Sequence, residues 1–328
     1  MLYKNIISVE NLLIAWKEFV KGKRNRKDVC EFSLSLFENI IDVHNELLNK
    51  TYKHSNYEAF NISDPKPRNI HKATVKDRLL HHAVYRILYP FFDNKFVYDS
   101  YSCRNNKGTH KAMNRFRYFY RKVSKNNTKT VLVLKCDIKK FFASIDHQIL
   151  LNILSRHIKD KNVVWLLEKI IKSFDSGTDG KGLPLGNLTS QLFVNIYMNE
   201  FDQFMKHRLK IKYYIRYADD FVILNQDKDI LKLLLSKISQ FLTQNLELNL
   251  HPQKVSIKTF SSGIDFLGFV HFSHYRVLRT TTKKRMIKKI MKNKDKPQVI
   301  QSYLGLMKHG DCFELREKIK TTVLNSSY

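Results

Sequence analysis

Two adjacent aspartates in an otherwise apolar stretch constrain this chain more than any other feature. The stretch is IKYYIRYADDFVILN, residues 211–225, and its apolar halves on either side of Asp219 and Asp220 indicate a β-hairpin. Aspartate is a poor strand residue and neighbouring carboxylates repel each other, so a bound divalent cation is expected to offset their charge. The alternative is an ordinary hairpin turn, in which aspartate is favoured.

A third acid, Asp137, ends another buried strand pattern at residues 131–136. If the two strands are neighbours, the three carboxylates can hold two Mg²⁺ ions about 3.5 to 4 Å apart. Such a pair serves in-line phosphoryl transfer, because one ion lowers the pKa of the attacking hydroxyl and the other stabilises the leaving pyrophosphate. The acids therefore predict phosphoryl-transfer chemistry.

The charge balance indicates a polyanionic partner. Lys and Arg total 58 against 30 Asp and Glu, a formal net charge of +28, and 43% hydrophobic residues suffice for a core. Nucleic acid fits this profile better than a membrane, and the alternative is a merely basic surface.

No apolar run approaches eighteen residues, and acids lie where a signal peptide would be apolar, so we expect a soluble cytoplasmic protein. Neither a zinc site nor a disulfide framework is indicated by the spacing of Cys30, Cys103, Cys136 and Cys312.

Periodicity and turn residues predict alternating helical and extended segments. The expected helices are two within 9–50 around a basic run at 21–27, one over 75–92 ended by Pro90, and others at 108–123, after 188, at 228–248 and from 279 onward. The expected strands are a hairpin within 57–75, the strand at 131–136, the hairpin at 211–225 and strands within 255–272.

The stretch LPLGNLTSQLF, residues 183–193, is a glycine turn that runs into the helix after 188, with Thr189 or Ser190 as the expected cap. A glycine turn at a helix start can hold phosphate through its backbone N–H groups, but the pattern is weak evidence alone. Its meaning depends on the segments around it.

The order and content of these segments resemble those of reverse transcriptases over residues 60–272. DIKKFFASID resembles the motif with the first metal-binding aspartate, and YIRYADDFVIL the YxDD hairpin. The other matching segments are PKPRNIHKATVKDRLLHHAV (fingers), LPLGNLTSQLFVNIY (nucleotide-positioning turn and helix), LNLHPQKVSI (a palm motif with its lysine) and IDFLGF (primer grip).

The resemblance implies an α+β right-hand polymerase fold with fingers, a palm whose antiparallel sheet is flanked by helices, and a helical thumb. It divides the chain into a helical N-terminal extension (1–58), fingers (59–188, with the first palm strand at about 131–145 inserted), palm (189–272) and thumb (273–328). It also implies an RNA-directed DNA polymerase that binds template RNA, a cDNA primer or product, and deoxynucleoside triphosphates.

The resemblance assigns the catalytic metal ligands as Asp137, Asp219 and Asp220, with the backbone carbonyl of Ile138 as a further ligand. They would hold two Mg²⁺ ions, with Mn²⁺ as a substitute. Phe142 falls where the family has an aromatic steric gate against ribonucleotides, and ordinary core packing is the alternative.

The remaining assigned residues contact nucleotide or nucleic acid. The expected nucleotide-binding residues are Lys66, Arg68, Arg78, Phe142, Leu185, Gly186, Gln191 and Lys254. The expected primer and template contacts are Phe266, Leu267, Gly268, Lys283, Lys284 and Arg285. Lys66 and Arg68 would clamp the triphosphate, and Lys254 would protonate the departing pyrophosphate. Each of these lone basic residues has a merely structural or surface role as its alternative.

The turn also indicates a branch of the family. Typical members have QGxxxSP where this chain has LGNLTSQ, with Leu185 for glutamine and Gln191 for proline. That departure resembles reverse transcriptases of diversity-generating retroelements, which copy a template-repeat RNA with errors at adenines for mutagenic retrohoming. Those enzymes work with a small basic accessory protein, which can be oligomeric. Leu185 cannot hydrogen-bond near the nucleotide, so we expect looser checking of the new pair, with simple packing as the alternative.

Two other classes of function stay open. One is a group II intron-like or retron-like reverse transcriptase of ordinary fidelity, and the other is an inactive RNA-binding scaffold. With about 55 residues after the primer grip, we do not expect a large maturase domain plus an endonuclease. LGNLTSQ is not the retron turn, and three intact aspartates argue against the scaffold.

Overall fold

A computed structural model describes residues 2–63, 67–293 and 296–324. The chain forms two compact units. The first comprises Met1–Arg104, Ile138–Lys210 and Ile238–Leu250, and the second comprises Asn105–Asp137, Ile211–Lys237 and His251–Tyr328. The chain passes repeatedly from one unit to the other, and the predicted subdomain boundaries at 58, 188 and 272 stay a prediction.

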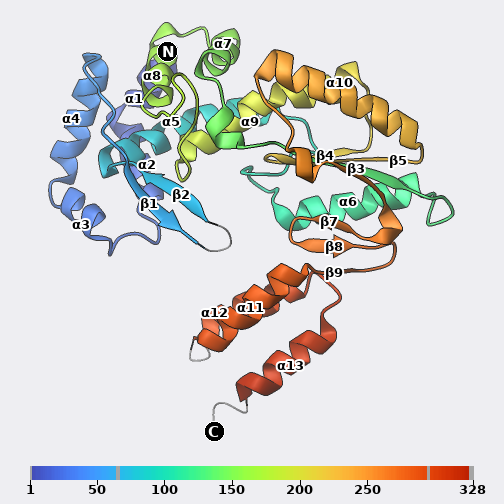
Figure 1. Cartoon of the computed structure of the whole chain (residues 1–328). Coiled ribbons are helices and arrows are strands. Elements are labelled where there is room, and N and C mark those ends of the chain that lie inside the picture. Colours follow the sequence, from blue (N-terminus) through green and yellow to red (C-terminus); the bar gives the residue numbers. More distant parts are fainter. Residues whose placement is uncertain (1, 64–66, 294–295, 325–328) are drawn as a thin grey trace. The chain divides into compact units, whose positions relative to one another are not determined.

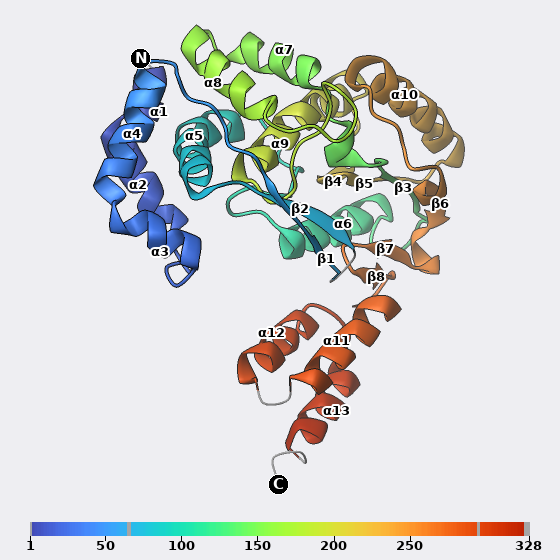
Figure 2. The same cartoon turned by 60° about the vertical axis from the view of Figure 1, so that its left-hand side comes forward.

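The first unit begins with four helices. They are α1 (Leu2–Ile7), α2 (Val9–Phe19), α3 (Lys27–Leu34) and α4 (Leu36–Leu48). Residues 9–50 are helical as predicted, but they form three helices where two were expected. The Ser8 side chain caps α2 by accepting from the Asn11 amide. The predicted hairpin follows as the antiparallel pair β1 (Glu58–Ile62) and β2 (Arg68–Lys72), seen in Figures 1 and 2.

Helix α5 (Val75–Asp93) contradicts the prediction that Pro90 ends it, because it runs three residues further. Proline in a helix interior removes one backbone hydrogen bond. Pro90 lies in the last turn, where this loss is small, and the fully buried Phe92 secures the turn against the core. Burial therefore outweighs the local penalty.

The rest of the first unit contains α7 (His147–His157) and α8 (Lys161–Ile171), which the periodicity analysis did not identify, and α9 (Leu188–Gln203). Asn187 precedes α9 without capping it through its side chain, so the prediction of Thr189 or Ser190 as the cap is wrong. Both lie buried inside the first turn because α9 is a central helix packed on α5. A π-helical turn, Phe204–Arg208, continues α9.

The second unit is built on a four-stranded antiparallel sheet in the order β4-β5-β3-β6, which Figure 2 shows side by side. Its strands are β4 (Tyr214–Tyr217), β5 (Asp220–Asn225), β3 (Leu132–Asp137) and β6 (Ser256–Thr259). Helix α6 (Thr109–Val123) packs against β4 and β5. Phe221, Val222, Ile223 and Leu224 of β5 are all buried, so this central strand is covered on both of its faces.

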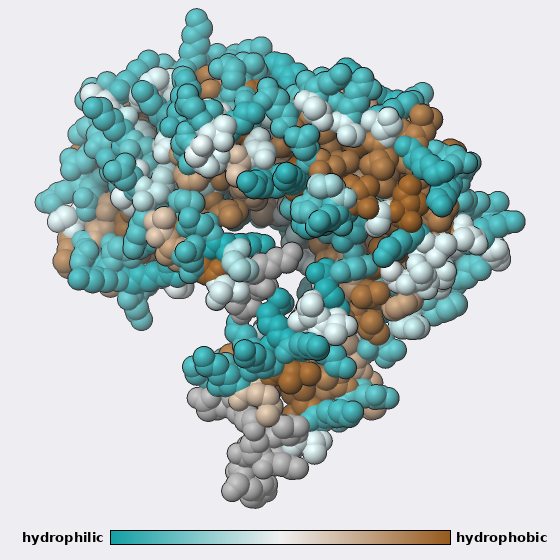
Figure 3. Space-filling model, in the orientation of Figure 1, coloured by the Kyte–Doolittle hydropathy of each residue, from teal (hydrophilic) through white to brown (hydrophobic). Residues whose placement is uncertain are grey.

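A three-stranded sheet and three helices complete this unit. The strands are β7 (Ile264–Phe266), β8 (Phe269–His271) and β9 (Arg276–Leu278), and the helices are α11 (Thr280–Lys292), α12 (Pro297–Met307) and α13 (Phe313–Leu324). Their shared core includes Phe269, Met286 and Met307. Helix α10 (Lys228–Leu246) is divided between the two units. No helix of the described residues is long and apolar enough to cross a membrane. Hydrophilic residues cover most of the face shown in Figure 3.

Candidate active site

The predicted acidic hairpin is formed by β4 and β5. Tyr217 pairs with Asp220, which leaves Ala218 and Asp219 as a two-residue turn. Ala218 has a φ of 55°, the left-handed conformation that such tight turns require. Asp219 therefore lies at the hairpin tip and Asp220 begins the returning strand.

Strand pairing brings the third acid beside this hairpin. β3 pairs with β5 in antiparallel register, and its last residue, Asp137, lies directly opposite Asp220. Like charges in opposed positions destabilise a sheet. The register thus concentrates negative charge at one end of the central strand pair.

The site strongly perturbs the carboxyl group of Asp220. Burial raises its pKa to about 7; Lys135 opposes this effect, and Asp137, Asp219 and Asp265 add to it. Its Oδ1 atom is buried and has no hydrogen-bond partner among the described residues. An orphaned carboxylate oxygen at such a place is a ready ligand for a hard cation.

Two lysines offset part of this charge. The Lys254 ammonium donates to Asp137 Oδ1 at 2.8 Å, and Lys135 lies 3.7 Å from Asp220 Oδ2 while donating to the Asp265 carbonyl at 2.6 Å. The amide of His251 donates to the Asp137 carbonyl at 2.7 Å, which positions the short helix bearing Lys254. The predicted phosphate-facing lysine is here a counter-ion of Asp137.

The donor set fits a divalent metal ion chemically. It offers hard carboxylate oxygens, one of them unpartnered, and mutual repulsion that a cation would relieve. In residues 2–63, 67–293 and 296–324, however, no three His, Cys, Asp or Glu side chains already converge as a metal cluster. The lysine contacts take up part of the charge compensation that a cation would supply.

The predicted glycine turn lies in the first unit and packs on β2. The His71 amide donates to the Leu185 carbonyl at 3.1 Å. Gly186 has a φ of 111°, and a Cβ there would lie 3.1 Å from Ile70 Cγ2, so a side chain at this position would be strained by its conformation and crowded by Ile70. Leu185 itself is half-buried.

Three predicted nucleotide-binding residues, Arg78, Gly186 and Gln191, line one cavity of about 260 Å³. Arg78 forms an ion pair with Asp28, which also lies 2.9 Å from the Lys72 ammonium of β2. Asp28 thus links Arg78 to the hairpin that carries Arg68, and the supporting role of Arg78 stays a prediction. Arg68 is exposed on β2, and Lys66 lies outside the described residues.

The remaining predicted residues of the first unit are Ile138 and Phe142. Ile138 is buried and forms an isolated antiparallel bridge with Leu250. Phe142 lies in a short 3₁₀ helix, half-buried, and its carbonyl accepts from the Leu183 amide at 2.8 Å. It is not a fully buried core residue.

The predicted primer grip is the tight turn between β7 and β8. Leu267 and Gly268 form its tip at positive φ, whereas Phe266 is buried with its ring 5.2 Å from that of Phe116. On α11, Lys283 and Lys284 are exposed, while Met286 is in the core below them. Arg285 is half-exposed on the same helix. The helix therefore presents a basic outer face.

Sequence reasoning missed Lys135, which supports the site. It is half-exposed between the buried Leu134 and Cys136 of β3, and this polar interruption of an apolar strand was the signal that could have found it.

A comparison with known protein families decides the identity of this fold. The family described as reverse transcriptase (RNA-dependent DNA polymerase) matches residues 53–271. The chain belongs to the reverse transcriptase family. The matched span contains the three aspartates, the glycine turn and the β7–β8 hairpin, so this reverse transcriptase has its candidate site within the family region.

Curated relatives of this reverse transcriptase include intron-encoded proteins. Protein YkfC of Escherichia coli is 26% identical over 63% of the chain and 63% of its own length. A putative COX1/OXI3 intron 2 protein of Saccharomyces cerevisiae is 22% identical, covering 82% of the chain and 38% of the relative. The group II intron-encoded protein LtrA of Lactococcus lactis is 24% identical, covering 65% of the chain and 45% of the relative. The chain thus spans less than two thirds of each.

Solved structures similar to this reverse transcriptase include telomerases. An apo telomerase from Candida tropicalis has a TM-score of 0.52 at 14% identity, covering 72% of this chain and 59% of that one. A telomerase from Candida albicans has a TM-score of 0.53 at 12% identity, covering 83% of this chain and 56% of the telomerase chain. At these identities the likeness concerns the fold alone, and it confirms the predicted α+β right-hand polymerase class.

Proposed function

We propose that this reverse transcriptase is an RNA-directed DNA polymerase that extends a primer on template RNA with deoxynucleoside triphosphates. The observation that carries the proposal is the register of Asp137 opposite Asp220, with Asp219 at the adjoining turn. No packing or capping role needs three acids at one strand end. Phosphoryl transfer does need such a set, and the family match supports it.

In this proposal Asp137, Asp219 and Asp220 hold Mg²⁺, with Mn²⁺ as a substitute and the Ile138 carbonyl as a further ligand. Bound ions would supply activation of the primer hydroxyl and charge stabilisation at the pyrophosphate. Lys254, beside Asp137, would donate its proton to the leaving pyrophosphate, as its place within hydrogen-bonding distance of that carboxylate allows. Lys283, Lys284 and Arg285 would bind the nucleic-acid backbone.

Primer extension tests this activity. The wild type with Mg²⁺ should extend oligo(dT) on poly(rA), and Asp219→Ala and Asp220→Ala should each abolish extension while leaving RNA binding in place. A wild type that binds RNA and makes no product would identify an inactive scaffold. Extension that survives both substitutions would show that the acids are not catalytic.

We further propose that the enzyme belongs to a diversity-generating retroelement and copies a template-repeat RNA with errors at adenines. The supporting observation is the turn LGNLTSQ. Leu185 offers an aliphatic side chain at the position where family members with the typical QGxxxSP motif have glutamine. A small basic accessory protein would be its partner. The other candidate, a group II intron-like enzyme of ordinary fidelity, is favoured by relatives such as LtrA.

Sequencing of cDNA separates these two candidates. The wild type and Leu185→Gln should be compared on one RNA template of balanced composition. The proposal expects frequent misincorporation opposite adenine in the wild type and fewer such errors in the variant, because an amide restores hydrogen bonding near the new pair. A low error rate at adenines in the wild type would assign the enzyme to the group II-like class.

A further inference from the structure

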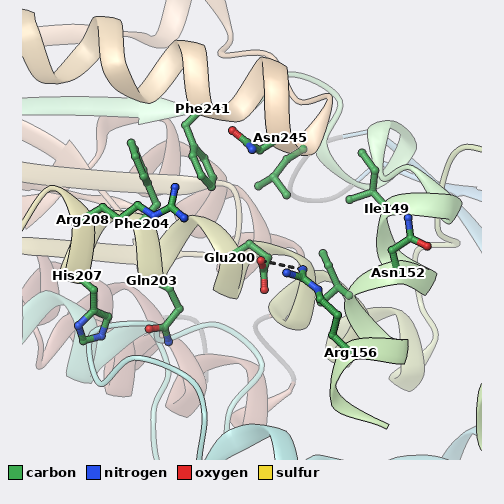
Figure 4. A pocket seen from close by; sticks show the side chains of 12 residues that line it. Ile149, Asn152, Arg156, Glu200, Gln203, Phe204, His207, Arg208, Phe241 and Asn245 are labelled. Atoms are coloured by element: carbon green, nitrogen blue, oxygen red, sulfur yellow. Dashed lines mark hydrogen bonds and ion pairs between the residues drawn. The ribbon is translucent and has the colours of Figure 1, made fainter. Parts of the chain in front are cut away.

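A second cavity in the first unit lies away from every predicted site residue. It has a volume of about 590 Å³ and is bounded by α7, by the end of α9 with its π-helical turn, and by the last turns of α10 (Figure 4). Such a volume falls within the range of small-ligand sites, roughly 300 to 1,000 Å³. Nothing in the proposed polymerase chemistry uses it.

The apolar part of the cavity is an aromatic pair. Phe204 of the π-helical turn and Phe241 of α10 stack with centroids 4.1 Å apart and rings 13° from parallel. Both rings are half-buried, so part of their surface faces the cavity. A half-exposed aromatic platform suits a nucleobase, because every base has a π-face.

The rim of the cavity is polar and carries an excess of positive charge. Arg156 forms an ion pair with Glu200 at 2.9 Å, the dashed contact in Figure 4. Arg208 lines the same cavity, and its side chain extends toward the Phe204–Phe241 pair. Within the described ranges Arg208 and the Asn245 amide have no hydrogen-bond or ion-pair partner. One cation and one amide are therefore available to a ligand.

The backbone beside the platform is itself unusual. The Leu209 amide donates to the Phe204 carbonyl at 2.9 Å, closing a π-helical turn over Phe204–Arg208. Single π-turns are rare and occur frequently at functional sites. This turn opens the basic run KHRLKIK, residues 206–212, so the cavity edge adjoins further cations.

We propose that this cavity binds an unpaired nucleotide of a single-stranded RNA. The base lies against the Phe204–Phe241 pair, the phosphate meets Arg208, and the Asn245 amide reads a polar edge of the base or sugar. A stable protein interface takes roughly 20 to 30 residues on each side. The cavity is lined by 12 residues, and one stacked aromatic pair with a cation and an amide matches a single nucleotide instead. The inference rests on the proposed function only in taking RNA as the partner, and it concerns a site separate from the polymerase residues.

The test measures RNA affinity in the full-length protein. The probe is a fluorescein-labelled single-stranded RNA of mixed sequence, and the readout is its anisotropy across a salt series. Arg208→Gln and Phe204→Leu should each weaken binding roughly tenfold through loss of the charge-assisted contact or the stacking face. Arg208→Gln alone should also reduce the slope of log K against log salt by about 0.7, because one phosphate contact is lost from a single strand.

Lys161→Gln, a charge-neutralising change at an exposed position of α8, is the matched control and should leave affinity within about twofold of the wild type. Primer extension at a saturating concentration of template–primer hybrid should be unchanged in Arg208→Gln. The two proposals therefore fail separately. Failure of the polymerase proposal would appear as absent extension by the wild type, and failure of this site as unchanged RNA affinity in the cavity variants. Wild-type RNA affinity in both cavity variants would overturn the proposal. An equal loss of RNA affinity in Lys161→Gln would overturn it as well.

Discussion

Removing the charge of Asp220 should stabilise the metal-free protein at pH 8. Burial raises the pKa of this carboxyl from 3.8 to about 7, against the influence of Lys135 and with the help of Asp137 and Asp219. At 1.36 kcal/mol per pH unit, the shift corresponds to an upper bound of about 4 kcal/mol for the ionised form. Relaxation of the site reduces the expected gain for Asp220→Asn to about 2 kcal/mol, or roughly 4 °C in melting temperature.

The sign of the pH dependence follows from the raised folded-state pKa of Asp220. The stability that protonation contributes is complete below pH 3.8 and is lost as the pH rises through about 7. At pH 8 the wild type has lost it entirely, whereas asparagine resembles the protonated acid and retains it. The advantage of Asp220→Asn should therefore shrink steadily as the pH is lowered toward 4.

Calorimetric melting in EDTA at several pH values checks this prediction, with the exposed Asp179→Asn as a control of equal charge change. Added Mg²⁺ should then raise the melting temperature of the wild type and have little effect on Asp220→Asn, because the variant lacks a carboxylate ligand. A variant that melts at or below the wild-type temperature at pH 8 in EDTA would refute the argument that Asp220 is held under electrostatic strain.

Three further predictions concern other parts of the chain. Gly186→Ala should lower the free energy of unfolding by about 1 to 2 kcal/mol, because of its φ of 111° and the contact with Ile70; unchanged urea unfolding would contradict this. Burial lowers the pKa of His81 to about 3 and that of His271 to about 4. The free energy of unfolding should therefore decrease as the pH falls from 6.5 toward 4, because the unfolded state binds protons that these buried imidazoles do not. The decrease should be less steep in His271→Asn. Phe142→Ala should raise ribonucleotide incorporation relative to deoxynucleotide by roughly tenfold or more in single-nucleotide extension, and unchanged selectivity would assign the steric gate elsewhere.

Local patterns predicted the elements well where a single period dominates. The stretch at 211–225, apolar on either side of two acids, forms the β4–β5 hairpin, and the extended stretch at 57–75 forms the β1–β2 hairpin. Element ends were predicted less well. Pro90 was expected to end α5, and Thr189 or Ser190 to cap α9, yet burial of Phe92 and of the α9 first turn decided both ends.

The candidate site divides in the same way. The acids Asp219 and Asp220 stand out in sequence because charge is costly in an apolar hairpin, and the ordered motifs around them indicate the family. That Asp137 lies opposite Asp220 depends on the register of β3 with β5, two strands separated by about eighty residues of chain. No local pattern encodes such a pairing.

The amino-acid sequence by itself determined the types of most elements, α7 and α8 excepted, the acidic hairpin and the membership of the reverse transcriptase family. Only the tertiary structure decided that Lys254 is the counter-ion of Asp137, that Asp220 has a buried oxygen with no partner among the described residues, and that α7, α9 and α10 enclose an aromatic cavity. The physical reason is the range of the interactions. Periodicity and propensity act between near neighbours in the chain, whereas charge pairing and cavity shape arise between residues that only the fold brings together.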